Sequence, residues 1–152
     1  MVSDQEGPRL LVLLSGPNLQ LLGERQPEIY GRDRLQDHVA RAAKAAAARG
    51  FELEHLQADS EKELVEAVHR SRGRAAGIVV NAGALSHYGW SLHDALAAFE
   101  GVVVELHLSN PAAREPWRHR SVIGPVADGL VAGFGSLGYE LAVEAAARLI
   151  SD

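Results

Sequence analysis

The chain has 152 residues, 47% of them hydrophobic and 23% charged, a composition typical of one globular domain with a buried core. Its 15 basic and 20 acidic residues give a formal net charge of −5, which argues against a general nucleic-acid-binding protein. The absence of cysteine excludes disulfides, thiolate metal ligands and cysteine nucleophiles.

The N-terminal segment and the hydropathy predict where the protein works. Residues 1–10, MVSDQEGPRL, lack the apolar core of a signal peptide, and no apolar run approaches the length of a membrane span. We expect a cytoplasmic protein with no membrane or nucleic-acid partner. We also expect one domain over residues 1–152, in which residues 1–8 form a loose N-terminal extension.

Five short apolar runs alternate with helical patterns along the chain. The expected strands are residues 10–14, 51–56, 77–80, 102–106 and 129–134. The expected helices are residues 34–49, 60–72, 90–99 and 137–150. Strands that alternate with helices predict an α/β fold, a parallel sheet with right-handed crossovers and helices on both faces.

Local signals refine two helices and one strand. Asp33 is expected to cap the first helix, with Gln36 at the capping-box position. Ser60 and Glu63 form a second capping box at the start of the next helix. The second strand, residues 51–56, alternates apolar and polar side chains, which predicts a position near a sheet edge with one wetter face.

Polar side chains follow three of the predicted strands. These residues are Asn18 to Tyr30, Asn81 to His87, and His107 to Arg118. The first set lies in the loop 15–31, which is long for so short a chain, and such loops tend to be lids or binding loops. Ligands of open parallel sheets bind outside the carboxyl ends of the strands, so we expect the three sets to form one site.

Two other kinds of site are weighed against the sequence. Residues 133–138, GFGSLG, match the glycine pattern of dinucleotide sites, but no further strand with an acidic residue follows. We interpret these glycines as close packing of the last strand against the last helix. A metal site is also not expected, because His87 and His93 are six residues apart and no H-E-x-x-H motif occurs.

The remaining histidines and the first loop bear on two further alternatives. His38, His55 and His69 are interpreted as surface or hydrogen-bonding residues. A phosphoacceptor domain would need carboxylates after the first strand, where this chain has Ser15-Gly-Pro-Asn18. A flavin-binding domain would need a Ser-, Thr- and Gly-rich loop there, so both are weaker hypotheses.

His107 is the candidate proton donor. It ends the fourth strand with Glu105 two residues earlier, and therefore on the same face of the strand. A carboxylate partner fixes the tautomer of a histidine and favours its protonated form, which suits an acid near neutral pH. A structural histidine bonded to its neighbours is an equally good interpretation of this residue alone.

Tyr30 is the candidate base. A free phenol has a pKa near 10 and is ionised in about one molecule per thousand at pH 7. Arg25 in the same loop, with Arg114 or Arg118 from the third loop, is expected to favour the phenolate. An isolated tyrosine would instead pack the loop down and use its hydroxyl for a hydrogen bond.

Four separated blocks of this sequence closely resemble the type II 3-dehydroquinate dehydratases, over about residues 10–149. The blocks are GPNLQLLGERQPEIYG at 16–31, NAGALSHYGWSLHDA at 81–95, ELHLSN at 105–110 and AREPWRHRS at 113–121. The resemblance implies a flavodoxin-like three-layer fold whose five-stranded sheet has the order 2-1-3-4-5. It also implies dehydration of 3-dehydroquinate to 3-dehydroshikimate in the shikimate pathway to aromatic amino acids, without metal or cofactor.

The resemblance assigns roles to the candidate residues. Tyr30 matches the base that removes a proton beside the substrate ketone, and Asn18 matches the position that stabilises the enolate, through an ordered water. His107 matches the acid that protonates the departing hydroxyl, and Glu105 matches its partner. Arg25 matches an essential arginine on a mobile lid.

The same resemblance predicts the substrate contacts and the assembly. The expected substrate-binding residues are Asn81, His87, Asp94, Leu108, Ser109, Arg114 and Arg118. Leu108 and Ser109 are expected to hold the carboxylate through backbone N–H groups, and Asp94 to reach into the site of a neighbouring subunit. Members of the family are dodecamers built from trimers. A non-catalytic small-molecule binding or signalling domain on the same fold is the rival hypothesis.

Overall fold

A five-stranded parallel sheet in the order β2-β1-β3-β4-β5 forms the centre of the computed structural model, which describes residues 9–152. The strands are β1 (Arg9–Ser15), β2 (Phe51–Gln57), β3 (Gly77–Asn81), β4 (Val102–His107) and β5 (Gly129–Ala132). The helices are α1 (Pro27–Tyr30), α2 (Leu35–Ala48), α3 (Glu61–Ser71), α4 (Trp90–Ala97) and α5 (Gly138–Ser151). The predicted fold class and strand order are confirmed, whereas the predicted extension over residues 1–8 lies outside the described residues.

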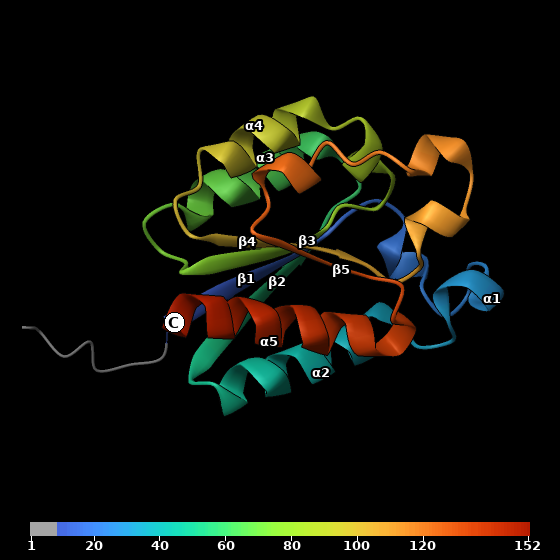
Figure 1. Ribbon diagram of the computed structural model, residues 1–152. Helices are drawn as coiled ribbons and strands as arrows, with labels where there is room; N and C mark the ends of the chain where they lie inside the picture. Colours follow the sequence, from blue (N-terminus) through green and yellow to red (C-terminus); the bar gives the residue numbers. More distant parts are fainter. Residues whose placement is uncertain (1–8) are drawn as a thin grey trace, which may run out of the picture.

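The sheet is covered on both faces. Figure 1 shows α2 and α5 on one face and α3 and α4 on the other. In β1, Leu11 and Leu13 pack against the α2 and α5 side, and Val12 and Leu14 pack against the α3 and α4 side. Because successive side chains of a strand point to opposite faces, a strand buried on both faces needs a continuous apolar run.

β2 lies at one edge of the sheet, as its alternating sequence predicts. Phe51 is buried, whereas Glu52 and Glu54 are exposed. Charged side chains on an edge strand oppose pairing with another chain.

The start of α2 differs from the prediction. Asp33 does not cap this helix, because its carboxylate is paired with Arg41 at 2.8 Å. The carboxylate of Asp37 instead accepts the N–H of Arg34, at 2.9 Å. The helix begins one residue later than predicted, which moves the capping-box position from Gln36 to Asp37.

The start of α3 and the loop 15–31 show what local signals can and cannot reveal. Ser60 caps α3 as predicted, accepting the N–H of Glu63 at 3.2 Å. The loop, however, contains the short helix α1, whose first residue is Pro27. Proline suits this position because its fixed φ is already helical and its missing N–H would be unpaired there.

The described helices include none that is long and apolar enough to cross a membrane. One histidine, His38, is buried and another, His55, is partly buried. His38 on α2 is 1% exposed, with Nδ1 3.2 Å from an Arg41 nitrogen, so it is a buried rather than a surface residue. His55 on β2 is hydrogen-bonded to Ser15 at 2.9 Å.

Burial of these rings makes the stability of the fold pH-dependent. Burial lowers the pKa of both His38 and His55, and the positive charge of Arg41 acts on His38 in the same direction. As the pH falls through about 6.5, the unfolded chain binds protons that the folded chain does not. The free energy of unfolding is therefore expected to decrease from pH 7.5 to 5.5, by at most about 1.4 kcal/mol per pH unit for each histidine.

Urea unfolding at fixed protein concentration measures this slope. His55→Gln should reduce it, and His69→Gln is the matched control, because His69 lies exposed on α3. An unchanged slope in His55→Gln would contradict the assignment.

Candidate active site

A pocket of about 580 Å³ lies beyond the carboxyl ends of β1, β3 and β4, where the fold predicts a ligand site. The predicted residues that line it are Asn18, Arg25, Tyr30, Asn81, His87, His107, Leu108, Ser109, Arg114 and Arg118. Figure 1 shows α1 and the turns of residues 111–118 at the same end of the sheet. The three polar sets therefore meet at this one pocket.

Gly16 brings the first loop against the second. Its N–H donates to the carbonyl of Asn81 at 2.7 Å. A Cβ at this position would lie 2.4 Å from the carbonyl oxygen of Ala82, a distance that no side chain tolerates. Glycine is therefore required where the end of β1 passes the end of β3.

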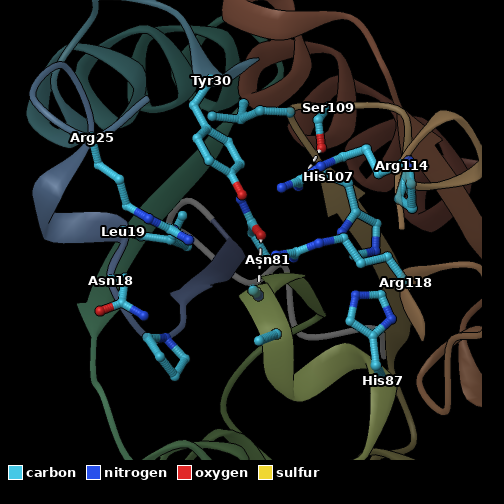
Figure 2. A pocket seen from close by; sticks show the side chains of 15 residues that line it. Asn18, Leu19, Arg25, Tyr30, Asn81, His87, His107, Ser109, Arg114 and Arg118 are labelled. Carbon is cyan, nitrogen blue, oxygen red and sulfur yellow. Dashed lines mark hydrogen bonds between the residues drawn. The ribbon is translucent and has the colours of Figure 1, made fainter. Parts of the chain in front are cut away.

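Tyr30 lies between two guanidinium groups. The central carbons of Arg25 and Arg114 each lie 5.1 Å from the centre of its ring. Figure 2 shows the tyrosine pointing into the pocket, with Arg25 approaching from the first loop and Arg114 from the far wall. The ring of Tyr30 therefore has a permanent positive charge on each of two sides.

His107 is joined to a buried carboxylate. Its Nε2 lies 2.6 Å from Oε2 of Glu105, which is only 1% exposed. The hydroxyl of Ser121 donates to Glu105 at 2.8 Å and accepts the N–H groups of Ile123 and Gly124. The buried carboxyl group of Glu105 is thus held by both a histidine and a hydroxyl, and it fixes the orientation of the His107 ring.

His87 stacks beside His107, with ring centres 6.3 Å apart. Its Nδ1–H donates to the carbonyl of Arg120 at 2.7 Å, which leaves Nε2 on the other side of the ring. Burial lowers the pKa of His87, and the positive charges of His107 and Arg118 act in the same direction, although the bond to Arg120 opposes them. The neutral imidazole is the favoured form.

Two further arginines are held in place around the pocket. Arg114 donates to the hydroxyl of Ser109 at 3.2 Å. Arg118 donates to Glu115 at 2.7 Å and lies 3.9 Å from the ring centre of Trp117. Together with Arg25 they give the pocket a strongly positive wall, which suits an anionic ligand.

Asn18 occupies a left-handed conformation, with φ of 67°. Its backbone N–H donates to Asp59 at 3.0 Å, and Gln57 and Gln20 also donate to that carboxylate. The N–H of Asn18 and the amide of Gln57 lower the pKa of Asp59. Asp59 therefore anchors the root of the loop that carries Asn18.

Two predicted residues lie outside the pocket in this single chain. Glu105 stands behind His107, as its predicted partner role requires. Asp94 on α4 has a side chain 86% exposed, and its carboxylate lies 3.9 Å from Nε2 of His93. Its expected reach into a neighbouring subunit stays a prediction.

Sequence reasoning missed Asp59 and Ser121. Each acts by a contact across a long sequence separation, 41 residues from Asp59 to Asn18 and 16 from Ser121 to Glu105. Ser121 ends the fourth matching block of the sequence, which was its only available signal. Across the described residues, no group of three or more histidines and carboxylates could hold a metal ion.

The chain is similar to known proteins in both sequence and structure. A family model described as dehydroquinase class II matches residues 9–147. The 3-dehydroquinate dehydratase 2 of Pseudomonas aeruginosa is 49% identical over 136 residues, which cover 90% of this chain and 92% of that protein. A 3-dehydroquinate dehydratase of Corynebacterium glutamicum is 48% identical over 142 residues, 93% and 98% of the two chains. The crystal structure of the type II dehydroquinase from Propionibacterium acnes superposes with a TM-score of 0.88 at 37% identity, covering 96% of this chain and 99% of the other.

Removal of the Ser121 hydroxyl tests the support of the buried carboxylate. Ser121→Ala deprives Glu105 of a donor and two backbone N–H groups of their acceptor. We expect the free energy of unfolding to fall by about 1.5–3 kcal/mol, measured by urea denaturation. Ser91→Ala, at an exposed position on α4, is the matched control. An equal loss in the two variants would show that Ser121 supports nothing in particular.

Proposed function

Because the chain belongs to the class II dehydroquinase family, and is a 3-dehydroquinate dehydratase, we propose that this pocket eliminates water from 3-dehydroquinate through an enolate. The reaction is an anti elimination that gives 3-dehydroshikimate, as a step of the shikimate pathway. One observation supports the proposal most: Tyr30 with its two arginines and His107 with its carboxylate line the same pocket.

The chemistry requires one base, one acid and a stabiliser of the intermediate charge. The carbonyl acidifies the neighbouring C–H bond, whose proton passes to the base while its electron pair forms the enolate. The enolate then collapses to the enone as the C–O bond breaks, and the acid gives a proton to the hydroxyl, which leaves as water. No electrons are gained or lost overall, so no redox partner is needed.

Tyr30 is the base. Arg25 and Arg114 flank its ring, and their positive charges attract negative charge on the phenol oxygen. Arg25 and Tyr30 both lie on the lid, so closure places the cation and the base over the substrate as one unit. Water leaves the pocket on closure, which strengthens the attraction between the charges.

His107 is the acid. Glu105, bonded to Nε2, fixes the orientation of the imidazole ring. Nδ1 is then the ring nitrogen that serves the departing hydroxyl. Ser121 keeps the carboxylate oriented toward the ring rather than toward solvent.

The remaining residues bind the substrate. Asn18 stabilises the enolate through an ordered water, and the backbone N–H groups of Leu108 and Ser109 hold the carboxylate. The substrate hydroxyls are contacted by residues with free hydrogen-bonding capacity, namely Asn81, His87, Arg114 and Arg118. The positive charge of this wall complements the negative charge of the substrate.

We also propose a cytoplasmic homo-oligomer, a dodecamer built as a tetramer of trimers, in which Asp94 completes a neighbouring site. Large apolar side chains remain exposed in the single chain, including Trp90 beside Asp94, and Leu130 and Phe134 on and after β5. Apolar groups of this size at a surface commonly mark an interface.

Replacing the base and the acid tests the two central roles. Tyr30→Phe and His107→Ala are each expected to lower kcat by at least about a hundredfold, because each removes a proton-transfer group. The rise in enone absorbance after addition of 3-dehydroquinate measures turnover. Tyr88→Phe, an exposed tyrosine, is the matched control for the lost hydroxyl. Near-normal turnover in either variant, with the fold intact by circular dichroism, contradicts its assigned role.

Replacing the lid arginine separates catalysis from binding. Arg25→Ala should be nearly inactive because the phenolate loses one of its two cations, yet Arg114 and Arg118 should still attract the substrate. Isothermal titration calorimetry with 3-dehydroquinate, beside kinetics on the same preparation, measures both properties. Arg72→Ala, remote from the pocket, is the control. Full loss of binding with Arg25→Ala would instead make this residue chiefly a substrate anchor.

A further inference from the structure

A chain of hydrogen bonds crosses the sheet behind the pocket, from the edge strand to Asn81. Nε2 of His55 lies 2.9 Å from the hydroxyl of Ser15, and that hydroxyl lies 3.2 Å from the hydroxyl of Tyr139. The side-chain N–H of Asn81 donates to the Tyr139 oxygen at 3.3 Å. Ser15 and Tyr139 are fully buried and Asn81 is 3% exposed, so these groups cannot use bulk water instead.

The direction of the chain follows from its chemistry. The nitrogen of Asn81 can only donate, so the oxygen of Tyr139 accepts. The hydrogen of Tyr139 then goes to Ser15, and the hydrogen of Ser15 goes to Nε2 of a neutral His55. Burial lowers the pKa of His55 and raises that of Tyr139, which favours these neutral forms. In this arrangement every hydroxyl hydrogen has an acceptor.

A stacking contact and the close approach of α5 to the sheet position the phenol ring of Tyr139. The ring of His38 stacks on it, with centres 5.2 Å apart. Gly138, the preceding residue, lets α5 approach the sheet, since a Cβ there would lie 3.1 Å from Cδ1 of Leu106. Gly138, the last glycine of the pattern at residues 133–138, thus allows Tyr139 to lie close to the sheet.

The chain fixes the amide of Asn81 in one orientation. Its oxygen accepts the N–H of Gly83 at 3.3 Å, while its nitrogen donates to Tyr139. Rotation of the amide by half a turn would set two N–H groups against each other and leave Tyr139 without a donor. One N–H and one oxygen lone pair of Asn81 remain for a ligand in the pocket.

We infer that Tyr139 is a positioning residue for substrate binding, whose hydroxyl, backed by Ser15 and His55, holds the Asn81 amide ready for the substrate hydroxyls. This inference rests on the proposed function, in which Asn81 contacts the substrate. Tyr139 itself does not line the pocket, so its effect on the substrate passes through Asn81. The folded protein already holds the amide in this orientation, so substrate binding does not add the entropy cost of ordering it.

A double-mutant cycle tests the inference. Tyr139→Phe, Asn81→Ala and the double variant are compared by KM and kcat for 3-dehydroquinate. Tyr139→Phe should raise KM roughly threefold to tenfold, the effect of one lost hydrogen bond, and change kcat less than about twofold. The double variant should have the KM of Asn81→Ala alone, because Tyr139 acts only through that amide. Tyr88→Phe, exposed and outside the chain of bonds, should leave KM unchanged.

Ser15→Ala is the second variant, because it keeps the phenol but removes the acceptor of its hydrogen. KM should rise about twofold to threefold. A merely structural role for Tyr139 would lower the melting temperature of both variants and leave KM unchanged, which overturns the inference.

The remaining outcomes separate the inference from the proposed function. Two outcomes overturn the inference alone. In the first, the KM increases of the two single variants multiply in the double variant. In the second, KM is normal in Tyr139→Phe but raised in Asn81→Ala. A normal KM in Asn81→Ala overturns the substrate contact and the inference together.

Discussion

The contact between the ends of β1 and β3 determines where everything else in the site can lie. The N–H of Gly16 donates to the Asn81 carbonyl. A Cβ at this position would lie 2.4 Å from the Ala82 oxygen, so the two strand ends can approach this closely only because the residue is glycine. The first loop then starts on the pocket wall that Asn81 helps to form. The loop therefore begins at the pocket, and both Arg25 and Tyr30, which it carries, line that pocket.

Opposite charges support the two halves of the proposed reaction. The proposed base, Tyr30, stands between two arginines, and the proposed acid, His107, stands against a buried carboxyl group. These two environments lie on opposite walls of one small pocket, with Arg25 and Tyr30 on the lid and Glu105 and His107 on the sheet. The pair on the sheet is formed by neighbouring residues of β4, whereas the environment of Tyr30 needs both the first loop and Arg114 from the far wall.

The sequence predicts those parts of the molecule that depend on local pattern or on strand order. Continuous apolar runs and the alternation in β2 indicate a parallel sheet and its edge, and parallel topology then brings Tyr30, Asn81 and His107 to one end. The capping of α2 was predicted wrongly because the Asp33 carboxylate pairs with the Arg41 guanidinium instead of accepting a backbone N–H of the helix. The supporting roles of Asp59 and Ser121 depend on contacts between distant segments, which no spacing rule reveals.

The hydrogen-bonded chain from His55 to Asn81 lies among apolar core residues, so its polar side chains need a physical reason. Phenylalanine and alanine could fill the space of Tyr139 and Ser15 with little change in volume, and fully buried hydrogen bonds add little net stability over a well-packed apolar core. Stability alone is therefore a weak explanation for the polar side chains of Ser15, Tyr139 and Asn81 at these positions. A fixed amide at Asn81 gives stronger grounds, because a freely rotating amide would present the wrong group to the substrate in part of the population. In that case the hydroxyl of Tyr139 lowers the entropy cost of binding, at a small cost to the core.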